Sequence, residues 1–198
     1  MVATQVHTFS DFPLCPATRS AVARMGITTP TPVQAQTIPI LLDGRDVIGQ
    51  ARTGSGKTLA FSIPIAERCD SKVRGVQAIV LVPTRELAIQ VAGVLGTLAS
   101  SRNLRLALLY GGRSYGPERN ALARGVQIVV GTPGRTLDHL RQGTLVLRDL
   151  RVFVLDEGDE MLDQGFAPDV ERILSMTPES RQTALFSATV PDWVMRIA

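Results

Sequence analysis

The feature that most constrains this chain is a glycine-rich segment at residues 51–58, which reads Ala-Arg-Thr-Gly-Ser-Gly-Lys-Thr. Gly54 and Gly56 allow the backbone to curl so that successive N–H groups point inward, Lys57 reaches the β- and γ-phosphates, and the Thr58 hydroxyl binds Mg²⁺. The strict pattern has glycine at the position of Ala51, so the flanking sequence must support the interpretation. The segment predicts a site for a nucleoside triphosphate and magnesium.

The sequence on both sides of this loop has the character that a phosphate loop requires. Residues 45–50 read as a short strand, and residues 58–65 begin an apolar helix that we expect to be interrupted at Pro64. The phosphates would meet the N-terminus of that helix, where unpaired N–H groups and the helix dipole favour anions. The alternative is a glycine- and serine-rich turn that contains a lysine by chance.

The apolar residues of the whole chain predict an α/β fold, with a mostly parallel central sheet and helices on both faces. Most of the apolar runs lack polar alternation, as in strands that are covered on both faces. Helix-like segments lie between the runs, most clearly at residues 85–99, and 198 residues with this alternation are expected to form a single domain. The strand-like runs lie at residues 47–48, 78–82, 106–110, 126–130, 152–155 and 183–186.

Residues that directly follow these runs are the functional candidates, because ligands bind beyond the carboxyl ends of parallel strands. Asp156 follows the fifth run and is the expected magnesium ligand, and Glu157 is placed to orient or activate the attacking water. An acidic turn that caps the next helix is the alternative. Ser187 and Thr189 follow the sixth run, where they either hydrogen bond to this acidic loop or form a simple polar turn.

Three further strand ends suit the phosphates of a nucleic acid backbone. Thr132 and Pro133 predict a helix start, and such an N-terminus with Arg135 beside it can hold a phosphate. Each segment by itself is explained equally well as a helix cap or a turn. The three sets are Pro83, Thr84 and Arg85; Gly111 and Gly112; and Thr132, Pro133, Gly134 and Arg135.

Charge is unevenly distributed along the chain. Residues 102–151 contain nine arginines and three acidic residues, whereas residues 152–179 contain eight acidic residues and one arginine. The first block suits phosphates and the second suits a metal, although solvated helix faces explain both blocks as well.

Other features of the sequence predict a cytoplasmic location. Cys15 and Cys69 have no metal-binding spacing and are expected to be reduced thiols. There is no apolar run of eighteen residues, and residues 1–8 lack the pattern of a signal peptide.

In their order and spacing, these segments resemble the N-terminal RecA-like domain of the DEAD-box RNA helicases, over nearly the whole chain. Residues 26–34, with the upstream Phe9, look like the Q motif of the family, which lies within residues 1–34. The resemblance implies that Gln34 hydrogen bonds to adenine and that Phe9 packs on its ring, which selects ATP. In this family alanine is ordinary at position 51. The implied nucleotide-binding residues are Phe9, Thr29, Gln34, Ala51, Arg52, Thr53, Gly54, Ser55, Gly56, Lys57 and Thr58, with Mg²⁺ on Thr58 and Asp156.

The same resemblance assigns roles to the other strand ends. Residues 83–90 match motif Ia, residues 111–112 the GG motif and residues 132–135 motif Ib, which hold the sugar–phosphate backbone of RNA without reading its bases. Residues 187–189 match motif III, which together with Asp159 couples ATP hydrolysis to duplex disruption. The catalytic residues implied are Lys57, Asp156 and Glu157.

Two positions depart from the family pattern. Residues 156–159 read Asp-Glu-Gly-Asp, so Gly158 stands in place of alanine and is expected to loosen the loop. Ile27 stands where an aromatic residue is often found, which affects the packing near adenine.

The chain ends shortly after motif III, so the resemblance implies that the second RecA-like domain and its arginine fingers are absent. We therefore expect the isolated chain to bind nucleotide weakly, to have negligible RNA-stimulated ATPase activity and not to unwind duplexes. The alternatives are a P-loop DNA helicase or translocase, against which Gln34 and residues 132–135 argue, and a non-hydrolysing RNA clamp. Intact Lys57, Asp156 and Glu157 argue against the clamp.

Overall fold

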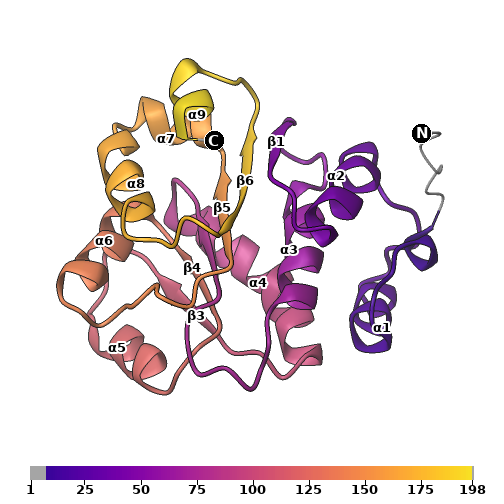
Figure 1. Ribbon diagram of the computed structural model, residues 1–198, viewed down its shortest axis with the longest axis horizontal. Coiled ribbons are helices and arrows are strands. Elements are labelled where there is room, and N and C mark those ends of the chain that lie inside the picture. Colours follow the sequence, from indigo (N-terminus) through magenta and orange to yellow (C-terminus); the bar gives the residue numbers. More distant parts are fainter. Residues whose placement is uncertain (1–7, 198) are drawn as a thin grey trace.

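Six parallel strands form one central sheet in the order β1-β6-β5-β2-β4-β3 (Figure 1). The computed structural model describes residues 8–197, so most of the segment searched for a signal peptide lies outside the described residues. Each of the six apolar runs overlaps one strand, which agrees with the predicted α/β fold class. The strands are β1 (Val47–Gln50), β2 (Ala78–Leu81), β3 (Leu106–Leu109), β4 (Ile128–Gly131), β5 (Val152–Asp156) and β6 (Gln182–Ser187).

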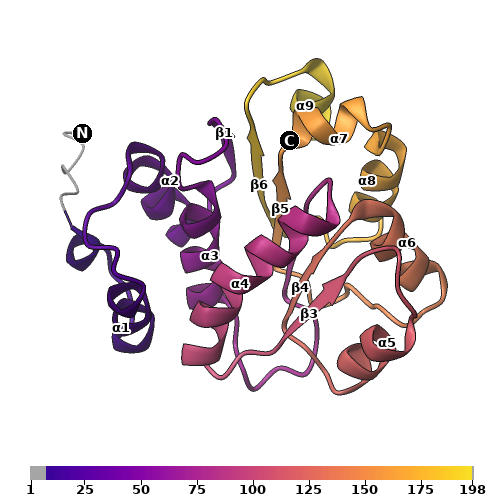
Figure 2. The same ribbon diagram turned by 180° about the vertical axis from the view of Figure 1, so that it is seen from behind.

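Helices cover both faces of the sheet, as Figures 1 and 2 show from opposite sides. Helices α3 and α4 pack on one face and helices α5 to α9 on the other, while α1 packs on the outer side of α3 and α4. The helical elements are η1 (Phe9–Asp11), α1 (Pro16–Arg24), α2 (Pro32–Leu42), α3 (Lys57–Arg68), α4 (Arg85–Ser101), α5 (Gly116–Ala123), α6 (Pro133–Arg141), α7 (Gly158–Asp163), α8 (Ala167–Leu174) and α9 (Asp192–Ile197).

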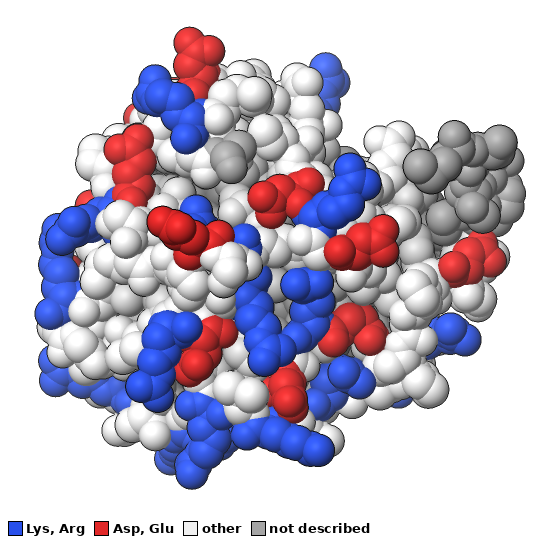
Figure 3. Space-filling model, viewed as in Figure 1, with Lys and Arg blue, Asp and Glu red and all other residues white. Residues whose placement is uncertain are grey.

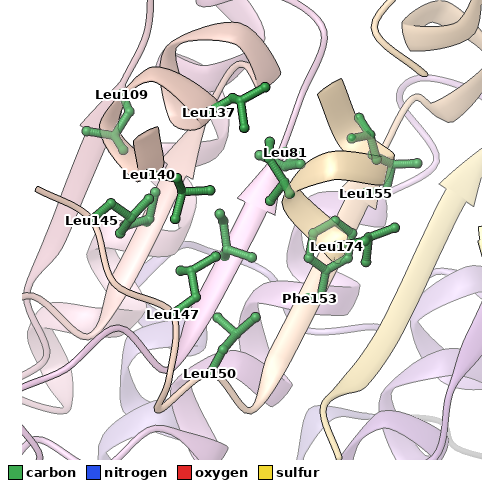
Figure 4. Packing of buried hydrophobic residues seen from close by; sticks show 14 of the residues in the cluster. Leu81, Leu109, Leu137, Leu140, Leu145, Leu147, Leu150, Phe153, Leu155 and Leu174 are labelled. Atoms are coloured by element: carbon green, nitrogen blue, oxygen red, sulfur yellow. The ribbon is translucent and has the colours of Figure 1, made fainter. Parts of the chain in front are cut away.

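The core lies on both faces because successive side chains of the central strands point in opposite directions. Leu81 and Phe153 pack with Leu140 of α6 and Leu174 of α8 on one face (Figure 4), whereas Val80 packs on the opposite face with residues of α3 and α4. Each such leucine or phenylalanine contributes about 1.5–3 kcal/mol on burial. The sheet is therefore a rigid support for the loops at its ends.

Helix α3 does not end at Pro64, so the expected interruption is wrong. The helix runs from Lys57 to Arg68 with Pro64 inside it, and every residue from Leu59 to Ala66 is buried. A proline removes one backbone hydrogen bond and costs about 3 kcal/mol in a helix interior. Here α3 lies between the sheet and the layer of α1 and α2, and packing on both sides outweighs that cost.

Buried glutamines close the amino end of the sheet. The carboxamide of Gln127 accepts a hydrogen bond from the N–H of Arg105 at 2.9 Å and donates one to the carbonyl oxygen of Val73 at 2.8 Å. Gln77 and Gln182 bind neighbouring loop backbone in the same way. Backbone groups that the sheet leaves unpaired at this end are thus satisfied internally.

Neither cysteine forms a disulfide: Cys15 and Cys69 are both free. Burial raises the pKa of the Cys69 thiol to about 12, despite the opposing effect of nearby arginines such as Arg151. Across residues 8–197, no helix is both long enough and apolar enough to span a membrane.

Candidate functional site

The strand order sorts the candidate segments into two halves of the carboxyl edge of the sheet. The segments that begin at residues 51, 156 and 187 follow the neighbouring strands β1, β5 and β6, and we call them the phosphate-loop half. Those that begin at residues 83, 111 and 132 follow the neighbouring strands β2, β3 and β4, and we call them the arginine half after Arg85, Arg113 and Arg135. Along the chain all three segments of the arginine half lie between the phosphate loop and the other two segments of its half, so only folding brings the phosphate-loop half together.

A cleft of about 290 Å³ opens beside the phosphate loop. Its polar side is formed by the loop, the end of β5 and a glutamine of α2, and its apolar side by the end of α1, its following turn and one side of α4. The lining residues are Met25, Ile27, Gln34, Thr53, Gly54, Gly56, Lys57, Thr58, Leu59, Leu87, Gln90, Val94, Asp156 and Glu157.

Lys57 and Asp156 form a buried ion pair at the bottom of this site. Lys57 is the first residue of α3 and Asp156 the last of β5, and Lys57 Nζ lies 3.4 Å from Asp156 Oδ1. Their side chains are only 6% and 2% exposed. Burial raises the pKa of the Asp156 carboxyl, and the positive charge of Lys57 opposes that rise.

Glu157 has a backbone conformation that is unfavourable for its residue type. Its φ of 59° and ψ of 53° are left-handed, which costs about 1–2 kcal/mol for a residue other than glycine. Its carboxylate accepts a hydrogen bond from Thr53 Oγ1 at 3.2 Å, and its N–H donates one to Asp156 Oδ1 at 3.1 Å. Strain of this kind is typical of functional sites, because the surrounding structure must maintain it.

Gln34 connects the start of α2 to the phosphate loop. Its Oε1 accepts a hydrogen bond from the N–H of Thr31 at 2.9 Å as part of a capping box, and its Nε2 donates one to the carbonyl oxygen of Gly56 at 3.0 Å. Gly56 has φ +93°, and a Cβ there would lie 2.6 Å from Gln34 Nε2 and 2.9 Å from Thr31 Oγ1. Glycine is therefore required at position 56 by both its backbone and its neighbours.

The loops after β5 and β6 are joined through Asp159. Its N–H donates to Ser187 Oγ at 3.0 Å, and its carboxylate accepts from the N–H of Thr189 at 3.0 Å and from Thr189 Oγ1 at 3.3 Å. Partial burial tends to raise the pKa of Asp159, but the hydrogen bonds from Ser187, Thr189 and nearby N–H groups outweigh it and lower the pKa.

Gly158 does not loosen this loop. It is buried and begins α7, and a Cβ at this position would lie 3.1 Å from Val194 and 3.2 Å from Leu155. Helix α9, which contains Val194, packs closely against the glycine. The expectation of a looser loop is wrong because tertiary packing, and not the freedom of the glycine backbone, determines this segment.

The arginine half differs in how much of it reaches the surface. Thr84 caps α4 by accepting a hydrogen bond from the N–H of Leu87 at 3.2 Å, and Arg85, Gly111 and Gly112 are exposed. Pro133 and Arg135 are buried at the start of α6. The Arg135 guanidinium is thus largely withdrawn from solvent, and its contact with a phosphate stays a prediction.

Five residues of the predicted nucleotide set do not line the cleft, and the sequence reasoning missed others that do. Phe9 is buried with its ring centroid 5.7 Å from that of Phe12, in a cluster that packs behind Met25, Ile27 and Val94 of the cleft wall. Leu87 and Val94 belong to an apolar stripe at helical spacing. Such a stripe looks the same whether its residues lie in the core or line a cleft. Ile27, which was expected near adenine, also lines the cleft. The five are Phe9, Thr29, Ala51, Arg52 and Ser55, and the lining residues not predicted are Met25, Leu59, Leu87, Gln90 and Val94.

The basic block of the sequence does not form one surface on the functional edge. Arg105, Arg124 and Arg151 come shortly before β3, β4 and β5, which places them at the amino end of the sheet. Figure 3 shows Lys and Arg gathered along the lower rim of the molecule. Counting arginines along the chain combines those that precede a strand with those that follow it. In the folded protein, these two groups lie at opposite ends of the sheet.

Comparison with known proteins gives consistent matches. A family model described as DEAD/DEAH box helicase matches residues 31–197. ATP-dependent RNA helicase DeaD of Klebsiella pneumoniae is 52% identical over 191 residues, covering 96% of this chain and 30% of the relative. DEAD-box ATP-dependent RNA helicase CshA of Geobacillus kaustophilus is 49% identical over 191 residues, covering 96% and 41%.

A solved structure matches over the whole fold. The crystal structure of a DEAD box protein from the hyperthermophile Methanococcus jannaschii has a TM-score of 0.94 and 43% sequence identity, covering 98% of this chain and 53% of that one. The chain therefore spans 30% to 41% of the length of the two curated relatives and about half of this structure.

Proposed function

Because the chain belongs to the DEAD/DEAH box helicase family, we propose that it is the ATP-binding and RNA-backbone-binding domain of an ATP-dependent RNA helicase. The observation that carries the proposal is the cleft in which the phosphate loop, the Lys57–Asp156 ion pair, Glu157 and Gln34 converge. Its chemistry is that of triphosphate binding beside a carboxylate that is placed to activate water.

The cleft offers distinct surfaces for the base and the phosphates of ATP. Met25, Ile27, Leu87 and Val94 form the apolar wall on which adenine packs, supported from behind by the cluster that contains Phe9. One hydrogen of Gln34 Nε2 is bound to the carbonyl oxygen of Gly56, and its second hydrogen is available to an acceptor on the base. The phosphates lie against the N–H groups of the loop and of the first turn of α3.

The residues of the site fit Mg²⁺ bound together with substrate phosphates. Thr58 and Asp156 supply one hydroxyl and one carboxylate, and Mg²⁺ typically takes one or two carboxylates and completes its shell with water and phosphate oxygens. When bound, the ion neutralises negative charge that develops on the phosphates.

Two side chains have to change partners in this proposal. Lys57 leaves Asp156 and turns toward the β- and γ-phosphates, which frees the Asp156 carboxylate. Glu157, now hydrogen bonded to Thr53, orients and activates the water that attacks the γ-phosphate. The Asp159 hydrogen bonds to Ser187 and Thr189 transmit the state of the acidic loop to the segment after β6.

The arginine half holds the RNA strand through its sugar–phosphate backbone, without selecting its bases. Thr84 and Thr132 stand at the N-termini of α4 and α6, where N–H groups attract phosphates, and the exposed Gly111 and Gly112 allow close approach of the strand. The proposal includes a second RecA-like domain of a longer chain, which supplies the arginines that complete the ATP site, and a cytoplasmic location, where ATP and RNA are both present.

Glu157→Gln tests the hydrolytic role. In the longer protein that we propose, this variant should bind a fluorescent ATP analogue within about twofold of wild type and lose RNA-stimulated phosphate release by about 100-fold or more, since general-base catalysis contributes about 10²–10⁴. Single-stranded DNA of the same sequence is the comparison that separates an RNA helicase from a DNA translocase. Hydrolysis at the wild-type rate in Glu157→Gln, or equal stimulation by DNA, would contradict the proposal.

A further inference from the structure

A buried carboxylate lies beneath the arginine half. Glu118 of α5 is 1% exposed. Its Oε1 accepts hydrogen bonds from the backbone N–H of Tyr110 at 3.2 Å and from Arg113 Nε at 2.9 Å. Its Oε2 lies 2.8 Å from His139 Nε2 and 3.6 Å from Arg135 Nη1. One side chain therefore contacts four groups.

These four groups come from two segments that the proposed function assigns to RNA. Tyr110 and Arg113 lie on either side of Gly111 and Gly112, and both glycines have open space around the position of a Cβ. Arg135 and His139 lie on α6, whose N-terminus follows Thr132. Glu118 thus joins the glycine loop to α6, and the glycine pair itself has no side chain with which to fix its position.

Two tyrosines extend the connection. The Tyr110 ring lies between two guanidinium groups, 4.0 Å from that of Arg113 and 5.0 Å from that of Arg85. The Tyr115 ring lies 3.8 Å from the Arg135 guanidinium, and the Tyr115 hydroxyl donates a hydrogen bond to Asp138 at 2.8 Å. All three segments of the arginine half are therefore connected through aromatic rings and the one carboxylate.

Because these charged groups are buried, each of them must keep its partners. A carboxylate that is removed from water is tolerated only when it is paired and hydrogen bonded, and the same holds for the buried Arg135 guanidinium. Arg135 also donates a hydrogen bond to the carbonyl oxygen of Arg113, which ties α6 back to the glycine loop. If either segment moved, it would leave buried charge without a partner.

We infer that Glu118 is a positioning residue for RNA: it fixes the glycine loop relative to the N-terminus of α6, so that both contact phosphates of the same strand. The inference rests on the proposed function and adds a residue that does not itself touch RNA. Glu118 acts through the segments it holds, and its negative charge would by itself repel the strand.

Because of that repulsion, the direction of the change in RNA affinity distinguishes two explanations. Glu118→Gln removes one negative charge beneath an RNA-binding surface, so electrostatics alone predicts tighter binding of RNA. Positioning predicts weaker binding, because the NH₂ group of the glutamine donates hydrogens where one carboxylate oxygen now faces Arg113 or His139, and the ion pair with Arg135 loses its negative charge. The two explanations therefore predict changes in opposite directions.

The purified 198-residue chain is titrated against a fluorescein-labelled single-stranded oligouridylate, and binding is followed by fluorescence anisotropy. The titration is repeated between about 50 and 200 mM salt, because phosphate contacts make affinity strongly salt-dependent in this range. Glu118→Gln should raise the dissociation constant about 5- to 10-fold and reduce the salt slope by about 0.7, the value for one lost phosphate contact on a single strand. The affinity of this variant for a fluorescent ATP analogue should stay within about twofold of wild type. A general loss of stability would lower the amount of folded protein but would not change the salt slope of RNA binding.

Glu67→Gln is the matched control. It changes the net charge equally, and Glu67 Oε1 likewise accepts a backbone hydrogen bond, from the N–H of Cys15 at 3.1 Å, at the junction of α1 and α3. RNA affinity should not fall in this variant. If Glu118→Gln does not fold, Glu118→Asp keeps the charge, withdraws the carboxylate by one methylene, and should weaken RNA binding in a protein whose circular dichroism spectrum is that of wild type.

The outcomes separate the inference from the proposed function. If wild type binds RNA and the folded Glu118 variants bind it as tightly or more tightly, the inference is overturned alone. If wild type binds the ATP analogue but no RNA, the proposed RNA-binding function is overturned and the inference with it. Weaker RNA binding with a reduced salt slope and unchanged nucleotide affinity supports both.

Discussion

The two halves of the carboxyl edge differ in how their buried charges are paired. In the phosphate-loop half, Lys57 and Asp156 form a single ion pair. In the arginine half, Glu118 is hydrogen bonded to both Arg113 and His139 and also lies 3.6 Å from Arg135 Nη1. Each half also holds a buried polar atom without a hydrogen-bond partner within the described residues, Ser55 Oγ in the first and Arg135 Nη1 in the second. The same parallel sheet supports both arrangements at its neighbouring strand ends.

This difference reflects the work proposed for each half. A site that performs chemistry must exchange partners when its ligand arrives, so single contacts and a strained residue such as Glu157 suit it. A surface that holds a backbone only has to stay in place, and a carboxylate that pairs with two arginines and a histidine beneath it reduces the cost of ordering on binding. Perturbing one half at a time should therefore give effects of different kinds.

The largest expected effect is on stability, from breaking the network of the arginine half. Arg135→Ala should reduce the free energy of unfolding by about 3 kcal/mol, because it leaves Glu118 with one fewer cation in a buried site, and should lower Tm by about 6–12 °C. Thermal unfolding followed by circular dichroism measures this change. Arg85→Ala is the control: Arg85 is exposed, so Tm should change by less than about 2 °C while RNA affinity falls. Equal Tm values for the two variants would contradict the contrast.

Next in size is a loss of nucleotide affinity confined to the phosphate-loop half. Lys57→Ala should weaken binding of an ATP analogue about 10- to 100-fold, because a hydrogen bond to a charged group contributes about 1.5–3 kcal/mol. Isothermal titration calorimetry measures it, and RNA affinity should remain within about twofold. Lys72, the other lysine of the chain, is exposed, and Lys72→Ala should leave nucleotide affinity unchanged. If RNA binding fell together with ATP binding in Lys57→Ala, the two halves would not be separable.

Two glycines, one in each half, allow the same substitution to be compared. Gly56 and Gly112 both have positive φ, of +93° and +81°, but a Cβ would meet Gln34 and Thr31 at position 56 and nothing within 4 Å at position 112. Both alanine substitutions should cost about 1–2 kcal/mol of backbone strain. Only Gly56→Ala should also weaken ATP binding, by about 10-fold, because Gln34 must move. Titration of both variants with the fluorescent analogue checks this, and a similar loss in Gly112→Ala would refute the explanation.

The smallest expected effect concerns pH. The folded pKa of Asp159 lies below its ordinary 3.8, so its hydrogen bonds to Ser187 and Thr189 stabilise the fold above that pH and lose their contribution as the pH falls through the lower folded value. Asp159→Asn should lower Tm by about 1–2 °C at pH 7, and the difference should shrink below pH 3.8. Differential scanning calorimetry at several pH values measures this. Asp163 is exposed on the same helix, and Asp163→Asn should leave Tm unchanged at every pH. If the Tm difference between Asp159→Asn and wild type were the same at all pH values, ionisation of Asp159 would not be its cause.

Much of the local structure could be read from particular residues. The Thr132–Pro133 pair predicts the start of α6, which begins at Pro133 with Thr132 as its N-cap, and four apolar residues before Asp156 predict the buried strand β5. Local patterns sufficed at these places because caps and apolar runs act over a few neighbouring residues. The interruption at Pro64 failed because packing from two sides outweighs the loss of one hydrogen bond.

The candidate site was less completely predictable. Glu118 and His139 have no motif, and their importance arises only when α5 and α6 approach each other. Arg135 was predicted to lie beside a phosphate at a helix N-terminus, and that pattern does not reveal its burial against the Tyr115 ring and the Glu118 carboxylate. A pattern can indicate which residues are polar, whereas tertiary contacts determine which way they face.

By itself, the sequence determined the phosphate loop, the six strands and the short segments that follow them, since each of these depends on neighbouring residues. Only the tertiary structure decided the strand order β1-β6-β5-β2-β4-β3, and therefore the sorting of those segments into the phosphate-loop half and the arginine half. The physical reason is that parallel strands pair across helical connections, so their order depends on the packing of helices against both faces of the sheet. The phosphate loop is followed along the chain by segments of the other half, and folding alone places it beside Asp156 and Glu157.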